Sequence, residues 1–288
     1  MSKKKDNATR GAVDGMAVTP LLRWAGSKRK LLPELLRYVP DGIKTYIEPF
    51  SGSACLFFAL RPSCAVLSDL NNELIETYRI VRAHPKLVRR AVAAMPRTKR
   101  HYYAIRGAAT TRLTDIEKAA RFVYLNRNCF NGVYRTNRAG LFNVPRGKRA
   151  GELPTESSFI RCANALRKAV LVDGDFEEAV AQAKPGDFVY LDPPYAKRGS
   201  RRRGEYGYKS FDISDLTRLS HCLRTLDRNG ATFLLSYACC REIRDIADEW
   251  HSRTILVRRH VAGFQEHRAR VREILISNIH PKSRMVPR

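Results

Sequence analysis

The stretch Asp192-Pro-Pro-Tyr195 places a carboxylate, two prolines and an aromatic ring within one short turn. It follows the apolar run from Phe188 to Leu191, which is typical of a buried strand, and the prolines end that strand because they cannot continue a ladder. In open α/β sheets, ligands bind beyond the carboxyl ends of the strands. A planar base with an exocyclic amine suits this turn, because the amine can donate to Asp192 and to a backbone carbonyl while the base stacks on Tyr195. The alternative is a plain strand end with a half-buried tyrosine.

A second turn with small residues follows a predicted strand at 45–48 and precedes a predicted helix. Gly52 permits the close approach of a cofactor, the helix N-terminus offers unpaired N–H groups, and Glu48 faces the same crevice. Asp69 ends the next predicted strand, at the separation at which an acid binds ribose hydroxyls in dinucleotide-binding folds. The alternative role for Asp69 is to cap the helix that follows.

The segment before these strands contains Trp24, two small residues and Lys28. The small residues let a ligand approach the backbone, and Lys28 supplies a positive charge that can bond to a carboxylate. Gly26-Ser-Lys28 lacks the flanking residues of a nucleotide-triphosphate loop, so a phosphate loop is not expected. Apolar periodicity predicts a helix over 30–39. After a later strand, Asp175 and Phe176 can hold a nucleobase by hydrogen bond and stacking.

The chain has 53 lysines and arginines against 28 acidic residues, and its formal charge of +25 indicates a polyanionic partner. From about 84 to 165 the alternation of strands and helices lapses. Helices there precede a predicted hairpin with arms at 133–136 and 141–144. Its asparagines and arginines can read base edges, and Phe130 or Tyr134 can wedge or stack. The alternative is a solvated loop.

Other features exclude several classes of protein. No stretch approaches the roughly 18 continuous apolar residues of a membrane span, and the first residues lack the apolar part of a signal peptide. The 7 cysteines include no C-x-x-C pair, which argues against a disulfide framework and a zinc site. We therefore expect a cytoplasmic protein without a metal, and a disordered basic tail over 1–18.

Taken together, these motifs resemble the N6-adenine DNA methyltransferases of the DNA adenine methylase type. The resemblance extends from Leu21 to about Ile279 and rests on the following motifs in order: Trp24-Ala-Gly-x-Lys28, Glu48-Pro-Phe-x-Gly52, Asp69-x-Asn71, Leu125-Asn-Arg127, Phe142-Asn-Val-Pro145 and Asp192-Pro-Pro-Tyr195. It implies an α/β fold: a mostly parallel S-adenosyl-L-methionine (SAM)-dependent methyltransferase sheet with a reversed final strand and an inserted helical plus β-hairpin target-recognition domain. The implied division is a catalytic domain at 19–83 and 166–281, a recognition domain at 84–165, and a tail at 282–288.

The resemblance also implies roles for individual residues. The residues expected to contact SAM or line its pocket are Trp24, Lys28, Glu48, Phe50, Gly52, Asp69, Asp175, Phe176 and Asp192. The residues expected to meet double-stranded DNA are Phe130, Asn131, Arg135, Asn137 and Pro145, together with Arg201, Arg202 and Arg203 in a basic run that suits a phosphate backbone. Ala54 and Arg146 depart from the family pattern, which has a glycine and an aromatic residue there. The similarity of the hairpin suggests GATC as the target.

The expected reaction is methyl transfer to the exocyclic nitrogen of an adenine that has been flipped out of the duplex. Asp192 and the carbonyl of Pro193 would each accept one N–H, Pro194 would keep the turn rigid, and Tyr195 would hold the ring. Two alternatives remain open at this point: methylation of an amine or amide nitrogen in RNA or protein, and an inactive DNA-binding protein. A partner restriction endonuclease is not evident from the sequence.

Overall fold

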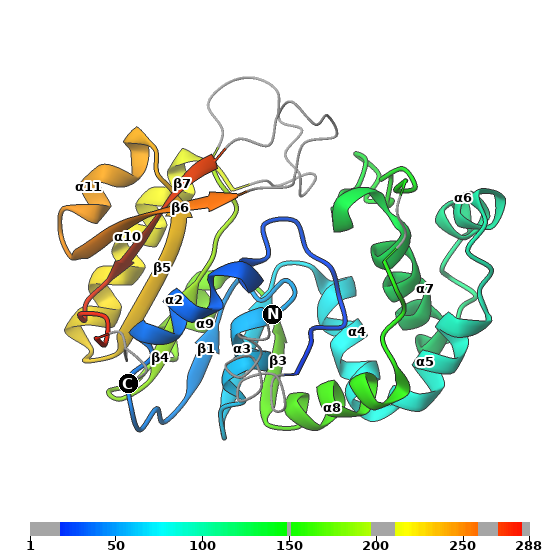
Figure 1. Cartoon of the computed structure of the whole chain (residues 1–288), viewed down its shortest axis with the longest axis horizontal. Helices are drawn as coiled ribbons and strands as arrows, with labels where there is room; N and C mark the ends of the chain where they lie inside the picture. Colours follow the sequence, from blue (N-terminus) through cyan, green and yellow to red (C-terminus); the bar gives the residue numbers. More distant parts are fainter. Residues whose placement is uncertain (1–17, 149–150, 197–210, 259–269, 284–288) are drawn as a thin grey trace, which may run out of the picture.

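The computed structural model describes residues 18–148, 151–196, 211–258 and 270–283. In this part of the chain, strands form a 7-stranded sheet in the order β3-β2-β1-β4-β5-β7-β6 (Figure 1). The strands are β1 (Tyr46–Glu48), β2 (Ala65–Asp69), β3 (Ala169–Asp173), β4 (Phe188–Leu191), β5 (Thr232–Ala238), β6 (His251–Arg258) and β7 (Arg270–Ser277).

The pairing of the strands confirms the predicted sheet. The first five strands pair in parallel, and β7 pairs antiparallel with both β5 and β6. The last strand of the chain therefore lies inside the sheet, between β5 and β6, rather than at its edge.

Helices surround the sheet and extend away from one end of it. The α-helices are α2 (Leu32–Leu35), α3 (Cys55–Leu60), α4 (Asn72–Ala83), α5 (Pro85–Ala94), α6 (Lys99–Gly107), α7 (Asp115–Asn128), α8 (Glu156–Leu166), α9 (Phe176–Ala181), α10 (Ile213–Arg228) and α11 (Arg244–Ala247). Short 3-10 turns are η1 (Lys28–Leu31), η2 (Leu36–Tyr38), η3 (Phe130–Gly132) and η4 (Arg241–Ile243).

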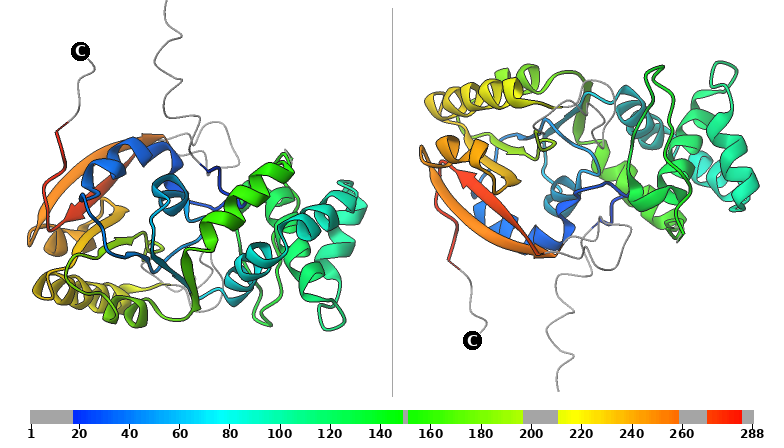
Figure 2. Two further views of the ribbon diagram at one scale, coloured as in Figure 1. Left: turned by 90° about the horizontal axis from the view of Figure 1, so that it is seen from below. Right: turned by 90° about the horizontal axis from the view of Figure 1, so that it is seen from above.

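Alternating side chains bury both faces of the sheet, as parallel strands require. In β1, Tyr46 belongs to the core beneath α3, α4 and α8, whereas its neighbour Ile47 belongs to the core beneath α9, α10 and α11. Phe188 and Val189 of β4 divide in the same way. Figure 2 shows α10 on one side of the sheet and α2 on the other.

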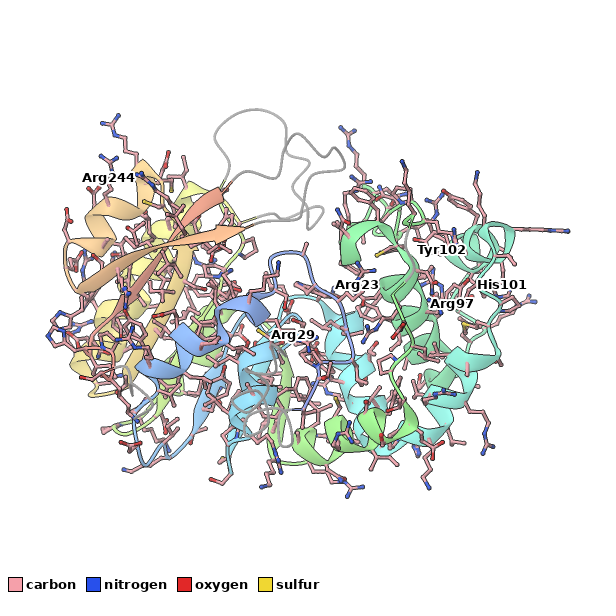
Figure 3. All side chains as sticks on the ribbon, viewed as in Figure 1. Arg23, Arg29, Arg97, His101, Tyr102 and Arg244 are labelled. Carbon is pink, nitrogen blue, oxygen red and sulfur yellow. The ribbon has the colours of Figure 1, made fainter. Side chains whose placement is uncertain are left out.

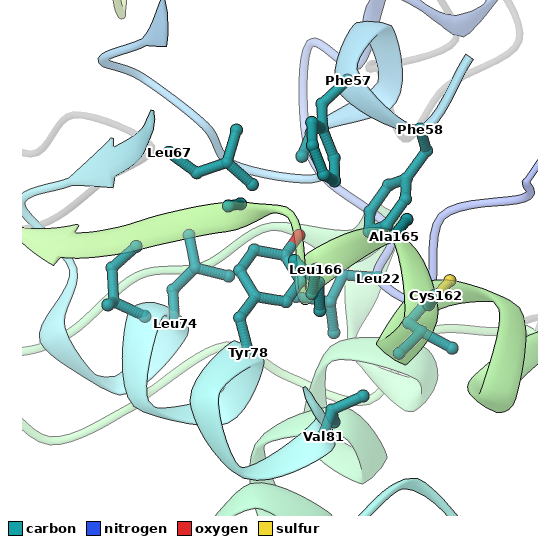
Figure 4. Close-up of a cluster of buried hydrophobic side chains, with 14 of the residues drawn as sticks. Leu22, Phe57, Phe58, Leu67, Leu74, Tyr78, Val81, Cys162, Ala165 and Leu166 are labelled. Atoms are coloured by element: carbon teal, nitrogen blue, oxygen red, sulfur yellow. The ribbon is translucent and has the colours of Figure 1, made fainter. Parts of the chain in front are cut away.

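Helices α5, α6 and α7 stand beside the sheet rather than on it (Figure 1). They share a continuous apolar core with α4 and α8, part of which Figure 4 shows around Tyr78, Leu166 and Val81. The Tyr78 hydroxyl donates to the Gly52 carbonyl over 2.7 Å, so this core reaches the predicted cofactor turn. The inserted helices thus pack on α4 and α8, and through α4 they connect to the turn after β1.

Two local expectations need adjustment. The helix predicted over 30–39 is wrong in form, because η1, α2 and η2 replace it; Pro33 lacks an N–H and cannot sit in the interior of a continuous helix. The predicted hairpin is present in outline only. Its arms join through a bridge between Thr136 and Phe142 and through the Asn143 N–H, which donates to the Arg135 carbonyl, without forming regular strands.

Candidate active site

Asp192 lies directly after β4, at the position predicted from the sequence. Its Oδ1 accepts hydrogen bonds from Lys28 Nζ over 2.6 Å and from Ser236 Oγ over 2.9 Å, and the Ser236 hydroxyl in turn lies 3.1 Å from the Tyr190 hydroxyl. Burial raises the pKa of Asp192, and the neighbouring Lys28 opposes this rise. Because both side-chain donors reach Oδ1, the second oxygen can face a ligand.

Lys28 is buried, with 4% of its side chain exposed, and it connects several groups of the site. Its Nζ lies 3.8 Å from Glu273 Oε2 and 5.7 Å from the centre of the Tyr195 ring. Burial alone would lower the pKa of Lys28, but the field of Asp192, Tyr195 and Glu273 outweighs it and raises that pKa. The lysine therefore stays charged beside Asp192.

In the turn after β1, the group that lies close to Gly52 is the Trp24 side chain of the protein itself. Gly52 has φ +44, and a Cβ there would lie 2.8 Å from Trp24 Cδ1, so glycine is required at this position. Ala54 also adopts the left-handed conformation, which costs an alanine about 1–2 kcal/mol. The departure from glycine at Ala54 thus keeps the shape of the turn at some expense in stability.

The two acids of this crevice have different partners. Asp69 Oδ2 accepts the Gly52 N–H and its Oδ1 accepts the Asn71 N–H, both over 3.0 Å. Burial raises the pKa of Asp69 to about 6. Asn71, not Asp69, caps α4, so the capping alternative for Asp69 is wrong. Glu48 is 2% exposed and accepts the Tyr46 hydroxyl over 2.9 Å, and burial raises its pKa.

Trp24 joins the crevice to the inserted region. Its ring stacks on Tyr134, with centroids 6.0 Å apart and planes 11° apart, and the Tyr134 hydroxyl donates to Glu73 over 2.8 Å. Tyr134, which the sequence offered as a wedge or stacking residue for DNA, contacts Trp24 in this structure. The spacing of the two residues in the chain gives no sign of this contact.

The Leu125-Asn-Arg127 motif holds the segment before Trp24. Asn126 Oδ1 accepts the Arg23 N–H over 2.8 Å, and Asn126 Nδ2 donates to the Arg23 carbonyl over 2.6 Å. Arg127 Nε donates to the Leu21 carbonyl over 2.7 Å. Figure 3 shows Arg23 where this segment passes α7, with Arg97 further along the inserted helices. This motif therefore fixes the wall of the crevice that carries Trp24.

Aromatic rings cluster around Phe50, which belongs to the turn after β1. Phe50 stacks on Phe176 at a centroid distance of 5.2 Å, and Phe211 meets the edge of Phe50 at 6.0 Å. Asp175 caps α9 by accepting the Glu177 N–H over 3.0 Å, and it pairs with Arg218. The predicted partners Phe50, Asp175 and Phe176 thus lie together, although the carboxylate already has protein donors.

The predicted DNA-contacting residues gather in and around the hairpin. Arg135 Nε donates to Asn143 Oδ1 over 2.8 Å, and the Phe130 N–H donates to the Pro145 carbonyl over 2.9 Å. Asn137 Oδ1 accepts the N–H groups of Ala139 and Leu141, which shapes the tip of the hairpin. Asn131 adopts a left-handed conformation with φ 54. Arg201, Arg202 and Arg203 lie outside the described residues.

Two residues of the site were missed in the sequence. Ser236 lies in β5 and Glu273 in β7. Both are buried: Ser236 bonds to Asp192, and Glu273 lies beside Lys28. The available signal for Glu273 is weak: it is the one acid of β7 and directly precedes the apolar run 274–276, but Arg272 lies beside it. Ser236 offers no comparable signal.

Comparison with known proteins identifies the family. The model of the D12 class N6 adenine-specific DNA methyltransferases matches residues 24–262, which include the Trp24, Asp69 and Asp192 motifs. The chain belongs to this family.

Individual relatives of this D12 chain have similar lengths. A protein named Type II methyltransferase M1.LlaDCHI, from Lactococcus lactis subsp. cremoris, is 31% identical over 269 residues, which cover 90% of this chain and 95% of the relative. A DNA adenine methylase from Serratia marcescens is 33% identical, over 71% of this chain and 77% of the relative. A DNA adenine methylase from Salmonella typhi is 29% identical, over 88% and 93%.

The D12 chain is therefore an enzyme that methylates adenine at N6 in DNA, using a methyl donor. Its resemblance to the DNA adenine methylase type is confirmed. Within the described ranges, no helix is long and apolar enough to cross a membrane, and no group of three or more histidine, cysteine or acidic residues is arranged to hold a metal ion. All 7 cysteines are free thiols.

Proposed function

We propose that this enzyme transfers the methyl group of SAM to N6 of an adenine flipped out of double-stranded DNA at a specific site. The observation that carries the proposal is the position of Asp192 at the end of β4, with Lys28 and Ser236 both bonded to Oδ1. One oxygen is held by the protein, and the other can accept an N–H from the base.

The crevice between the β1 turn and β4 fits SAM. Gly52 has no side chain between the backbone of the β1 turn and Trp24, and Asp69 places a partly buried carboxylate where ribose hydroxyls can donate. Phe50, which is partly exposed, offers an apolar face for the adenine ring of the cofactor, and the buried Phe176 packs against it. The remaining residues assigned to this site are Trp24, Lys28, Glu48, Asp175 and Asp192.

SAM would supply an electrophilic methyl group. The residues of the chain have to make the adenine nitrogen nucleophilic, because its lone pair is delocalised into the ring. Asp192 and the Pro193 carbonyl each accept one N–H, which draws the nitrogen toward tetrahedral geometry. Pro194 keeps the carbonyl and carboxylate in a fixed relation, and Tyr195 stacks on the base. Positioning of this kind contributes up to roughly 7–11 kcal/mol in well-oriented systems.

The direct test uses methyl-labelled SAM and duplex DNA. Label should appear as N6-methyladenine in the DNA hydrolysate, at one sequence context when methylated sites are mapped. Label in protein or RNA substrates instead, or DNA methylation that does not require SAM, would refute the proposal.

The same proposal assigns recognition to residues 84–165 and catalysis to 19–83 and 166–281. Phe130, Asn131, Arg135, Asn137 and Pro145 would meet the target from the hairpin side. The basic run with Arg201, Arg202 and Arg203 would bind phosphates.

Replacing Arg135 by alanine is expected to relax specificity at one position of the target site. A guanidinium can bond both O6 and N7 of guanine, and removing such a bidentate pair of hydrogen bonds costs about 1–3 kcal/mol of discrimination. In contrast, neutralising Arg201, Arg202 and Arg203 together should weaken binding to all DNA and lower the log–log salt slope by roughly 0.9 for each phosphate that is no longer neutralised. Methylation of the target and of each single-base variant, measured over a salt series, separates the two effects. If instead the triple variant loses sequence specificity and Arg135→Ala loses activity equally on all sequences, the two assignments are reversed.

SAM affinity is expected to fall as the pH drops through about 6, because burial raises the pKa of Asp69 to about 6 and the protonated acid loses its charge. The carboxylate form, present above that pH, is the better acceptor for ribose hydroxyls. Below it, affinity should decrease by up to roughly tenfold per pH unit. Calorimetric titration of SAM from pH 5 to 8 measures this, with Asp69→Asn as the comparison. An unchanged pH dependence in Asp69→Asn would assign the titration to another group.

A further inference from the structure

Glu273 is a buried acid to which adenine methylation, as derived so far, gives no role. It lies in β7 opposite Ala238 of β5 and Ile255 of β6, with 2% of its surface exposed. A carboxylate in such a place costs free energy unless charged or polar partners offset the loss of water. Its partners therefore indicate why an acid stands there.

Among its partners are two residues of the active site. The Tyr195 hydroxyl donates to Glu273 Oε1 over 3.2 Å, and Lys28 Nζ lies 3.8 Å from Oε2. The same ammonium is 2.6 Å from Asp192 Oδ1. Thus the Lys28 charge lies within 4 Å of two carboxylates, and the shorter contact is with Asp192.

This arrangement affects the two side chains proposed to meet the adenine, Tyr195 and Asp192. The edge of the Tyr195 ring already contacts Tyr237 at a centroid distance of 5.1 Å, and the hydroxyl bond to Glu273 fixes the far end of the ring. The second carboxylate places another negative charge near Lys28, whose ammonium bonds to only one oxygen of Asp192, Oδ1. Asp192 then keeps bonding capacity for the adenine amine.

We propose that Glu273 is a positioning residue for adenine methylation, which holds the Tyr195 ring through its hydroxyl and shares the Lys28 ammonium with Asp192. The inference rests on the proposed roles of Asp192 and Tyr195. It assigns a function to the reversed strand, which carries this acid into the middle of the sheet.

Replacing Glu273 by alanine should lower kcat by up to on the order of 10²-fold, the effect that a misplacement of about 1 Å can have. The KM values for SAM and DNA should stay within about threefold, because a positioning residue touches neither of them. Glu273→Gln retains an acceptor for the Tyr195 hydroxyl but loses the charge. Since a neutral hydrogen bond has roughly half the strength of a charge-assisted one, the glutamine variant should recover to within about tenfold of the wild type.

A double variant tests whether the acid acts through the tyrosine. Tyr195→Phe should reduce kcat in the wild-type background and have a smaller effect in the Glu273→Ala background, because residues that act as a unit are not additive. Thermal unfolding and SAM binding of each variant establish that it is folded. The near-isosteric glutamine variant gives a kcat even if the alanine variant does not fold.

Glu249→Gln is the matched control, since it removes an exposed acid that pairs with Arg224 at 2.5 Å on the surface. Its kcat should equal that of the wild type. Wild-type protein and Asp192→Ala, assayed alongside, report on the proposed function itself. Suppose that wild type and Asp192→Ala differ as expected. If the two Glu273 variants then retain wild-type kcat, or if the losses in the Glu273 variants add fully to the loss in Tyr195→Phe, the inference about Glu273 is wrong and the proposed function stands.

Discussion

The rate of methyl transfer should fall by on the order of 10²–10³-fold when Asp192 is replaced by alanine, the loss expected when one preorganised polar group is removed from a reacting centre. The carboxylate acts mainly in the transition state, where it accepts an N–H from the adenine amine. Single-turnover rates with saturating SAM and DNA measure the chemical step. SAM affinity needs a separate titration, because Lys28 loses its 2.6 Å partner in this variant.

Asp173→Ala provides the control for this experiment. Asp173 also ends a parallel strand, β3, but its carboxylate is 42% exposed and pairs with Arg79 at 3.1 Å. The rate should be unchanged in this variant. An Asp192→Ala enzyme that works within threefold of the wild type would remove Asp192 from the mechanism.

Tyr195→Ala should show the second-largest loss, about 1–3 kcal/mol, because an aromatic face that stacks on a base contributes that much. Tyr195→Phe keeps the face and loses only the hydroxyl bond to Glu273, so its loss should stay below about tenfold. Single-turnover rates and DNA affinity of both variants decide this. Equal losses in the two variants would show that the hydroxyl, not the ring face, is what the reaction needs.

Features that depend on local sequence could be predicted well. β4 ends at Leu191 because two prolines follow Asp192, and the β1 turn needs Gly52 because Trp24 lies against it. The proline pair and the small residues of the β1 turn are visible as residue types within a few positions of each other, whereas the contact of Gly52 with Trp24 is not. Placing the acid, the glycine turn and Asp69 at one edge of the sheet then follows from parallel pairing.

Contacts between distant residues could not be predicted. Lys28 and Asp192 are 164 positions apart, and Tyr195 and Glu273 are 78 apart, so their pairing depends on the strand order and not on any spacing in the chain. The stacking of Tyr134 on Trp24 is similar, since either ring alone is equally suited to a base. Burial in the folded protein gives these residues their partners.

The helix expected over 30–39 fails for a different reason. Its apolar positions have helical spacing, and the chain is helical from Lys28 to Tyr38, but as two 3-10 turns flanking a short α-helix with Pro33 in its first turn. A periodic apolar pattern indicates which side of a segment is buried. It does not establish that one regular helix presents that side.

The position of β7 has a consequence for biosynthesis. Among the described strands, β7 comes last in the sequence, yet it pairs with β5 from Leu234 to Ala238 in the interior of the sheet. Until a ribosome has released residues 270–277, β5 carries an open edge with buried-type side chains, and such edges pair readily with other chains. The same strand delivers Glu273 to the active site. A chain that is shortened before β7 should therefore be aggregation-prone and poorly active at once, so that methylation by incomplete molecules on DNA is suppressed.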